Sequence, residues 1–266
     1  MSTVNLTVPV SWNQLSRRQV LWVCRLFLVE LSEMEFRLRA FVKLAGLKAI
    51  QKEGEQGNFW FRSGDQEIRI HQQELLHFLG SVDYLLDASR LSVNRIPVFW
   101  MGWQRLYGPS SKCYNLTLAE YIHACGALYG YMQTREFRYV DRLFAVLYRP
   151  SGKGSGRADR RRSFDEYTYL GRVRWFGFIP RAKRLAVLLF FQGCQWEFQK
   201  AFTHLFPVGS VSSELVNPVP HLQQLIRVLN QDDVTRNPVI LNTPVWEAFA
   251  QLNDMMAKNK NTHKNG

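Results

Sequence analysis

Three apolar-rich runs of this 266-residue chain follow the same helix-start signature, a serine or threonine with glutamate or glutamine three residues later. The three pairs are Ser16 and Gln19, Ser32 and Glu35, and Thr117 and Glu120. Each pair stands ahead of an apolar-rich run and has the spacing of a capping box, in which the two side chains bond reciprocally to the backbone of the first turn. The pattern therefore constrains the chain to a largely helical fold.

Residues 1–90 are predicted to form a small α+β unit. The first two signatures indicate two helices joined by a tight turn. Two runs rich in β-forming residues follow at 58–62 and 66–70, and the three residues between them include a glycine, which indicates a β-hairpin. A broad apolar face over residues 72–86 predicts another helix. The expected fold class is mainly α with a small β-hairpin.

The rest of the chain is predicted to be a helical domain over residues 115–257, preceded by an irregular connection over 91–114. Pro150 should end one helix, because the residue before a proline leaves the α conformation. Pro180 suits the first position of the next helix. Residues 258–266 form a polar tail that we expect to be frayed.

The predicted connection over 91–114 is rich in aromatic side chains. They are Phe99, Trp100, Trp103 and Tyr107. Aromatic residues in such a segment can stack on a ligand, but packing of the connection against the core is the simpler interpretation.

The formal net charge of +12 is concentrated in one stretch. Residues 149–184 contain 11 basic and three acidic residues, a net charge of +8, whereas the other 230 residues carry +4. At the centre of this stretch, residues 151–163 contain glycine, serine and arginine and no large apolar residue. Such a segment buries too little surface to offset its ordering entropy, so we expect a mobile basic loop.

The basic stretch allows two interpretations. Its arginines, interleaved with aromatic residues, can bind the phosphates of a nucleic acid, as in single-strand binders. Alternatively, the stretch is a solvated loop that keeps the protein soluble. Cations at the start of the helix after Pro180 oppose the helix macrodipole, which favours an acidic partner. The candidate partner-binding residues here are Arg157, Arg160, Arg161, Arg162, Arg181, Lys183 and Arg184.

Neither a catalytic nor a metal-binding pattern is recognisable. The four cysteines lack CxxC spacing, the histidines form no HExxH arrangement, and no phosphate-binding glycine loop is present. We therefore expect no catalytic residue, no metal and no cofactor, and a protein that is not an enzyme. The cysteine usage fits a reducing cytosol. No apolar run reaches the length of a membrane span, and no signal peptide is visible, so a cytoplasmic location without membrane association is expected.

Three segments of the second half follow one another in a distinctive order. They are NLTLAEYI at 115–122, LFAVLYRP at 143–150 and LLFF at 188–191. This order, over about residues 115–205, resembles the tail-assembly chaperones and related tail-morphogenesis proteins of tailed bacteriophages and prophages, of the type found in Bacteroidetes.

The resemblance implies a non-enzymatic assembly or interaction protein of phage origin, acting in the cytoplasm of the bacterial host cell. Such a chaperone binds a tape-measure-like tail protein and covers its apolar stripes, a mode that needs exposed apolar grooves. The candidate contacts are Trp246, Phe249 and Met255. The alternative function is a nucleic-acid-binding module using residues 149–184. An enzyme with a site around His123 or His204 is the third hypothesis.

Overall fold

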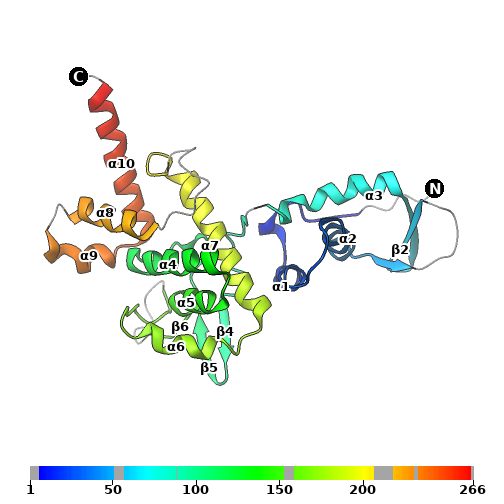
Figure 1. The fold of residues 1–266 in the computed structure, drawn as a ribbon, viewed down its shortest axis with the longest axis horizontal. Helices are drawn as coiled ribbons and strands as arrows, with labels where there is room; N and C mark the ends of the chain where they lie inside the picture. Colours follow the sequence, from blue (N-terminus) through cyan, green and yellow to red (C-terminus); the bar gives the residue numbers. More distant parts are fainter. Residues whose placement is uncertain are drawn as a thin grey trace. The chain divides into compact units, whose positions relative to one another are not determined.

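A computed structural model of the protein describes residues 6–50, 57–87, 89–152, 159–206, 218–230 and 233–264. The chain divides into two compact units, Met1–Ser89 and Arg90–Gly266 (Figure 1). The structure is 58% helical and 13% strand, which confirms the expected fold class of mainly α with a small β part. The described strands form two three-stranded antiparallel sheets rather than a single hairpin.

The first unit contains the predicted helical pair, hairpin and following helix. Its elements are η1 (Trp12–Gln14), α1 (Arg17–Leu26), α2 (Glu33–Leu44), β1 (Lys48–Ile50), β2 (Asn58–Ser63), β3 (Gln66–His71), α3 (Gln72–Leu79) and η2 (Gly80–Leu85). The sheet order is β1-β2-β3. The helix predicted over 72–86 changes from α to 3₁₀ geometry at Gly80.

Local signals position the helices of this unit. Ser16 and Gln19 form the complete capping box at the start of α1, with the Ser16 hydroxyl accepting from the Gln19 N–H at 3.3 Å and the Gln19 side chain accepting from the Ser16 N–H at 2.8 Å. Ser32 caps α2 by accepting from the Glu35 N–H at 3.2 Å, while the Glu35 carboxylate pairs with Arg39 instead of completing the box. The indole of the buried Trp12 donates to the Tyr84 carbonyl at 2.9 Å and so ties the start of the unit to its end.

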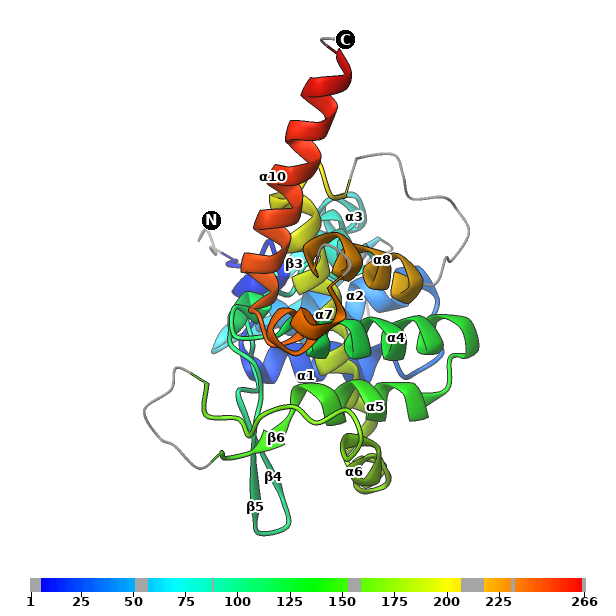
Figure 2. The same ribbon diagram turned by 90° about the vertical axis from the view of Figure 1, so that its left-hand side faces the viewer.

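The second unit is the predicted helical domain with an added sheet (Figures 1 and 2). Its elements are β4 (Val98–Met101), β5 (Gln104–Tyr107), η3 (Ser111–Cys113), α4 (Leu118–Thr134), α5 (Phe137–Leu147), β6 (Arg149–Pro150), α6 (Tyr169–Phe176), α7 (Arg181–Ala201), α8 (Pro218–Asn230), η4 (Val234–Arg236), α9 (Asn237–Leu241) and α10 (Val245–Lys264). Helix α5 packs against α4, α6 and α7.

Two regions of this unit differ from the sequence-based expectation. Residues 91–114 are not irregular, because β4 and β5 form an antiparallel hairpin that closes at Gly102, where φ is +59°. Glycine adopts this left-handed conformation without strain, and glycine in the first position of a two-residue turn is typical of a type II′ hairpin. The predicted tail is not separate either, because α10 continues to Lys264.

Backbone hydrogen bonds join the two ends of the basic loop predicted over 151–163. The Gly152 N–H donates to the Arg160 carbonyl at 3.0 Å, and the Arg162 N–H donates to the Pro150 carbonyl at 2.8 Å. Ser151 and Arg161 thereby pair as an antiparallel bridge that continues the direction of β6. Residues 153–158 lie outside the described part of the chain.

Helix α7 passes close to the start of the second unit, and a glycine makes this possible. A Cβ atom added at Gly193 would lie 2.3 Å from the Leu91 carbonyl oxygen and 2.5 Å from the Leu91 nitrogen. Backbone atoms cannot yield as the end of a flexible side chain does, so any larger residue forces the two segments apart.

We expect Gly193→Ala to lower the free energy of unfolding by about 1–3 kcal/mol, the usual cost of overpacking. Gly171→Ala in α6 is the matched control, because nothing lies within 4 Å of its added Cβ. The control should leave stability unchanged or raise it by up to about 1 kcal/mol, since alanine favours a helix. Urea unfolding measures both; equal stability of the two variants would contradict the close approach.

Candidate functional site

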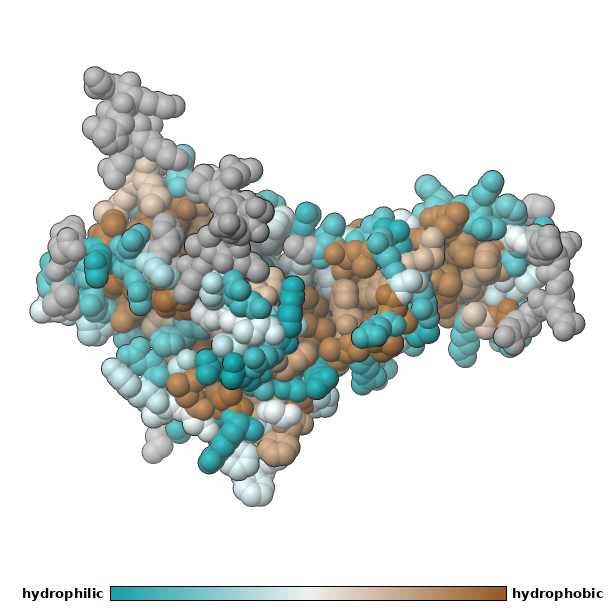
Figure 3. All heavy atoms as spheres, viewed as in Figure 1, coloured by the Kyte–Doolittle hydropathy of each residue, from teal (hydrophilic) through white to brown (hydrophobic). Residues whose placement is uncertain are grey.

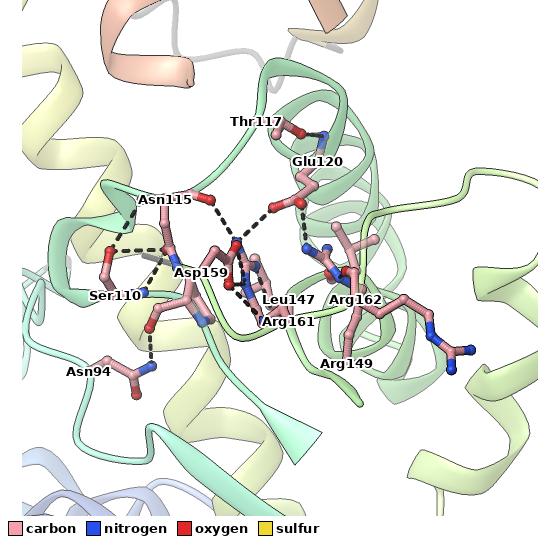
Figure 4. Close-up of polar contacts among 12 residues, drawn as sticks. Asn94, Ser110, Asn115, Thr117, Glu120, Leu147, Arg149, Asp159, Arg161 and Arg162 are labelled. Carbon is pink, nitrogen blue, oxygen red and sulfur yellow. Dashed lines mark hydrogen bonds and ion pairs between the residues drawn. The ribbon is translucent and has the colours of Figure 1, made fainter. Parts of the chain in front are cut away.

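The basic stretch meets a single glutamate in the interior of the second unit (Figure 4). Arg149 Nη2 lies 2.5 Å from Oε1 of Glu120, and Arg161 Nη2 lies 3.2 Å from Oε2. All three side chains are at most 2% exposed. The Thr117 hydroxyl accepts from the Glu120 N–H at 3.3 Å, as the signature predicts. The Glu120 carboxylate does not complete the capping box, however, because it neutralises the two arginines instead.

Three arginines also cap the C-terminus of α5. Arg172 donates to the carbonyl of Ala145 at 3.1 Å, Arg149 to that of Val146 at 2.8 Å, and Arg161 to that of Leu147 at 3.3 Å. The remaining carbonyl of the last turn, at Phe144, accepts from the Tyr148 N–H. The last four carbonyls of a helix lack intrahelical partners and form the negative end of its dipole, so the arginines supply both donors and compensating charge.

Arg161 has further partners that fix its position. Its guanidinium donates to both oxygens of Asp159 and to the Asn115 carbonyl, the latter at 2.7 Å. The Asn115 side chain in turn accepts from the backbone N–H and the hydroxyl of Ser110. Two carboxylates therefore balance the two buried arginines, Asp159 and Glu120 together carrying the opposite charge.

Burial acts differently on the two arginines. Desolvation lowers the pKa of Arg149 below its ordinary value, and the neighbouring Arg161 adds to this, although Glu120 opposes both. For Arg161 desolvation is also the largest influence, but Glu120 and Asp159 together outweigh it and raise its pKa. The second carboxylate thus favours the charged form of the more deeply buried arginine.

A second buried ion pair holds the start of α7. Arg184 Nη1 lies 2.8 Å from Oδ1 of Asp141 in α5, and both side chains are at most 10% exposed. Burial raises the pKa of Asp141, and Arg184 partly opposes this. The unfavourable position of this cation at a helix N-terminus is therefore offset by an internal carboxylate rather than by an external acidic partner.

The remaining basic candidates are more accessible. Arg160, Arg162 and Arg181 are exposed, and Lys183 is half-buried with its Nζ 5.1 Å from the centroid of the Phe99 ring. Arg157 lies outside the described residues. The prediction that Arg161 and Arg184 contact a partner at the surface is wrong, because each is buried in an ion pair.

The apolar candidates of the last helix differ in the same way. Phe249 is fully buried against Tyr121 and Phe198, so it cannot contact a partner. Trp246 is half-buried, and its indole donates to the Lys112 carbonyl at 2.9 Å. Met255 is 38% exposed. The apolar stripe of α10 therefore serves mainly to pack the helix onto the unit, and only its outer end is accessible.

The cysteines and His123, the other side chains that could take part in catalysis, also have structural roles. All four cysteines are free and buried, and burial raises the pKa of Cys24 and of Cys125 to about 12. His123 contacts Glu166 and the rings of Phe164 and Tyr169. No group of three or more His, Cys, Asp or Glu side chains that could hold a metal occurs in the described ranges. No helix of the described part is long and apolar enough to cross a membrane.

Comparison of this chain with family models, with curated proteins and with solved structures finds no match. The three segments singled out in the sequence nevertheless meet in one place. Glu120 of the first pairs with Arg149 of the second, and Tyr121 of the first lies 6.0 Å from Phe191 of the third, measured between ring centroids. The three segments therefore belong to one core of the second unit.

Sequence reasoning missed Glu120 and Asp141 as the acidic centres of these clusters. Asp141 had a usable signal, since it falls in the apolar run VDRLFAVL, where an unpartnered carboxylate would be costly. Glu120 had a competing local explanation as a capping residue, and that explanation concealed its longer-range role.

We expect Glu120→Ala to lower the free energy of unfolding by about 3–5 kcal/mol, because it leaves two buried guanidinium groups without their shared carboxylate. Glu136→Ala, which removes an exposed ion pair with Arg138, is the control and should cost less than about 1 kcal/mol. Chemical unfolding followed by tryptophan fluorescence compares the two. A loss in Glu120→Ala no larger than in the control would show that the cluster is not structural.

We expect the folded protein to react negligibly with a thiol reagent at pH 8, because thiolates are the reactive species and burial raises the pKa of Cys24 and Cys125 far above that pH. In denaturant, all four thiols should react. Absorbance after addition of Ellman's reagent counts them in both states, and rapid labelling of Cys24 or Cys125 in the native protein would overturn this assignment.

Proposed function

We propose that the protein is a non-enzymatic assembly factor that binds an apolar helical segment of another protein in the bacterial cytoplasm. In this proposal the partner is a tape-measure-like phage tail protein, as the resemblance of residues 115–205 implies. The observation that carries it is the turn between α1 and α2. Phe27, Leu28 and Val29 of the turn, and Met34 in the first turn of α2, are each 38–54% exposed, although large apolar side chains are normally buried.

This apolar turn is held in a fixed conformation. The N–H groups of Phe27, Leu28 and Val29 donate to backbone carbonyls of α1. The Phe27 ring packs against two other rings. Its centroid lies 6.4 Å from that of Trp12 and 4.8 Å from that of Phe36. A rigid apolar surface loses little entropy on binding, which supports a recognition role over a disordered excess of apolar residues. Figure 3 shows apolar surface reaching the exterior of the first unit.

Acidic side chains flank the apolar turn. Glu30 and Glu33 are exposed, and Glu35 is half-buried. An apolar centre with a polar rim is the usual anatomy of a binding surface. Glu33 pairs with Arg37, and Glu35 pairs with Arg39. The rim thus carries both signs of charge, which suits a partner helix whose apolar stripe has a mixed polar border. The contact surface is thus proposed on the first unit, and not on the mostly buried stripe of α10.

Co-expression tests this function. Together with the tape-measure-like protein of a neighbouring gene, the wild-type chain should raise the soluble yield of that protein. Leu28→Ser with Val29→Ser should abolish the increase, because it removes the apolar centre of the surface. Val239→Ser is the control, since Val239 is 73% exposed in α9 and has no part in the proposed surface.

Thermal melting of the purified variants by circular dichroism verifies that each is folded. The proposal fails if the wild-type chain leaves the yield unchanged, or if the folded double variant is as effective as the control.

A further inference from the structure

The β4–β5 hairpin presents tryptophan at its tip. Met101 and Gln104 are its last paired residues, so Gly102 and Trp103 form the turn. The Trp103 side chain is 96% exposed. In Figure 2 the hairpin extends away from helices α4 and α5. A ring of this size in full contact with water gains nothing for the fold, so its exposure indicates a role outside the protein's own core.

One face of the hairpin adds a second exposed ring and a cation. Trp100 is 58% exposed and stands opposite Arg105 in the strand register. The Arg105 guanidinium lies 4.9 Å from the Trp100 ring centroid and 6.0 Å from that of Tyr107. The alternate residues, Phe99 and Leu106, are buried and anchor the hairpin to the unit. The outward face is therefore an ordered platform of flat rings with a positive charge between them.

The charge around this platform has one sign. Residues 97–107, which include the hairpin, contain one basic residue, Arg105, and no acidic one. Residues 167–196, which form α6 and most of α7, contain five basic residues and no acidic one. Arg184 is neutralised by Asp141, whereas Arg174 and Arg181 are exposed and Lys183 is half-buried. The start of α7 lies against the hairpin, because the Lys183 ammonium is 5.1 Å from the Phe99 ring. A polyanion approaching the hairpin therefore meets cations from both segments.

We propose that the outward face and tip of the β4–β5 hairpin, with Trp100, Trp103 and Arg105 at its centre, bind single-stranded nucleic acid. Bases stack on exposed aromatic rings while arginine contacts phosphate, the combination found in non-specific single-strand binding. A duplex keeps its bases stacked internally and offers the rings no partner. An acidic peptide matches the charge but leaves the flat ring faces unused.

This site is distinct from the apolar turn of the first unit, so it adds a second binding activity to the proposed function. It also differs from the loop hypothesis for Arg160, Arg161 and Arg162, because the central arginine of that run is buried. Arg105 and Lys183 provide the positive charge beside the hairpin.

Fluorescence anisotropy of the full chain with a labelled 20-nucleotide oligo(dT) tests the proposal. The wild type should bind, and its affinity should fall steeply between 50 and 200 mM salt, as counterion release requires. Trp100→Ala with Trp103→Ala should weaken binding about tenfold or more, the usual effect of losing stacked bases. Arg105→Ala should weaken binding and reduce the salt dependence.

Two matched variants keep the test specific. Arg90→Ala removes an arginine that lies 5.1 Å over the Trp196 ring, the same kind of pair at another place, and should bind like the wild type. Trp103→Phe keeps a ring at the tip and should retain most of the affinity. Because the replaced rings are exposed, circular dichroism should show unchanged folding in each variant.

The proposal is overturned if the wild-type chain fails to bind at 50 mM salt, or if the double tryptophan variant binds as well as Arg90→Ala. Equal affinity for the same sequence as a duplex would show phosphate binding without stacking. Displacement of the oligonucleotide by poly-glutamate at equal charge concentration would assign the hairpin to an acidic protein instead.

Discussion

The carboxylate of Glu120 is the charge on which the second unit depends. Arg149 and Arg161 end beside it in the interior, where an unpaired guanidinium would be costly. Their other donors reach the last carbonyls of α5, so one cluster joins the start of α4, the end of α5 and the returning segment at 159–162. Removal of the carboxylate would uncouple three parts of the chain at once, which is why a single glutamate has so large an expected effect.

The positive charges of residues 149–184 therefore fall into two groups, one buried and one exposed. Arg149, Arg161 and Arg184 are internal and are matched by carboxylates, while Arg172 is half-buried on a helix end. Arg160, Arg162, Arg174 and Arg181 are exposed. The surface excess is therefore smaller than the sequence total indicates. What remains lies partly at the start of α7, beside the β4–β5 hairpin and its exposed tryptophans.

The two units offer surfaces of contrasting chemistry. The turn between α1 and α2 is apolar with a border of paired charges, which suits an amphipathic helix. The β4–β5 hairpin is aromatic and basic, which suits a single strand. Each surface consists of side chains that their own unit does not need for its core, and each is rigid because buried neighbours anchor it: Trp12 and Phe36 for the turn, Phe99 and Leu106 for the hairpin.

The sequence by itself determined the features that depend on near neighbours. The capping boxes and prolines predicted where α1, α2, α4 and α7 begin and where α5 ends, because each signal acts within four residues of the backbone it satisfies. The tertiary structure alone decided which charges are buried. Glu120 and Arg149 are 29 residues apart, and Asp141 and Arg184 are 43 apart, so no local pattern distinguishes them from solvated surface charges. The hairpin over 98–107 lies between these cases: Gly102 was visible as a turn former, but the register that exposes Trp100 and buries Phe99 follows from packing against α5 and α7.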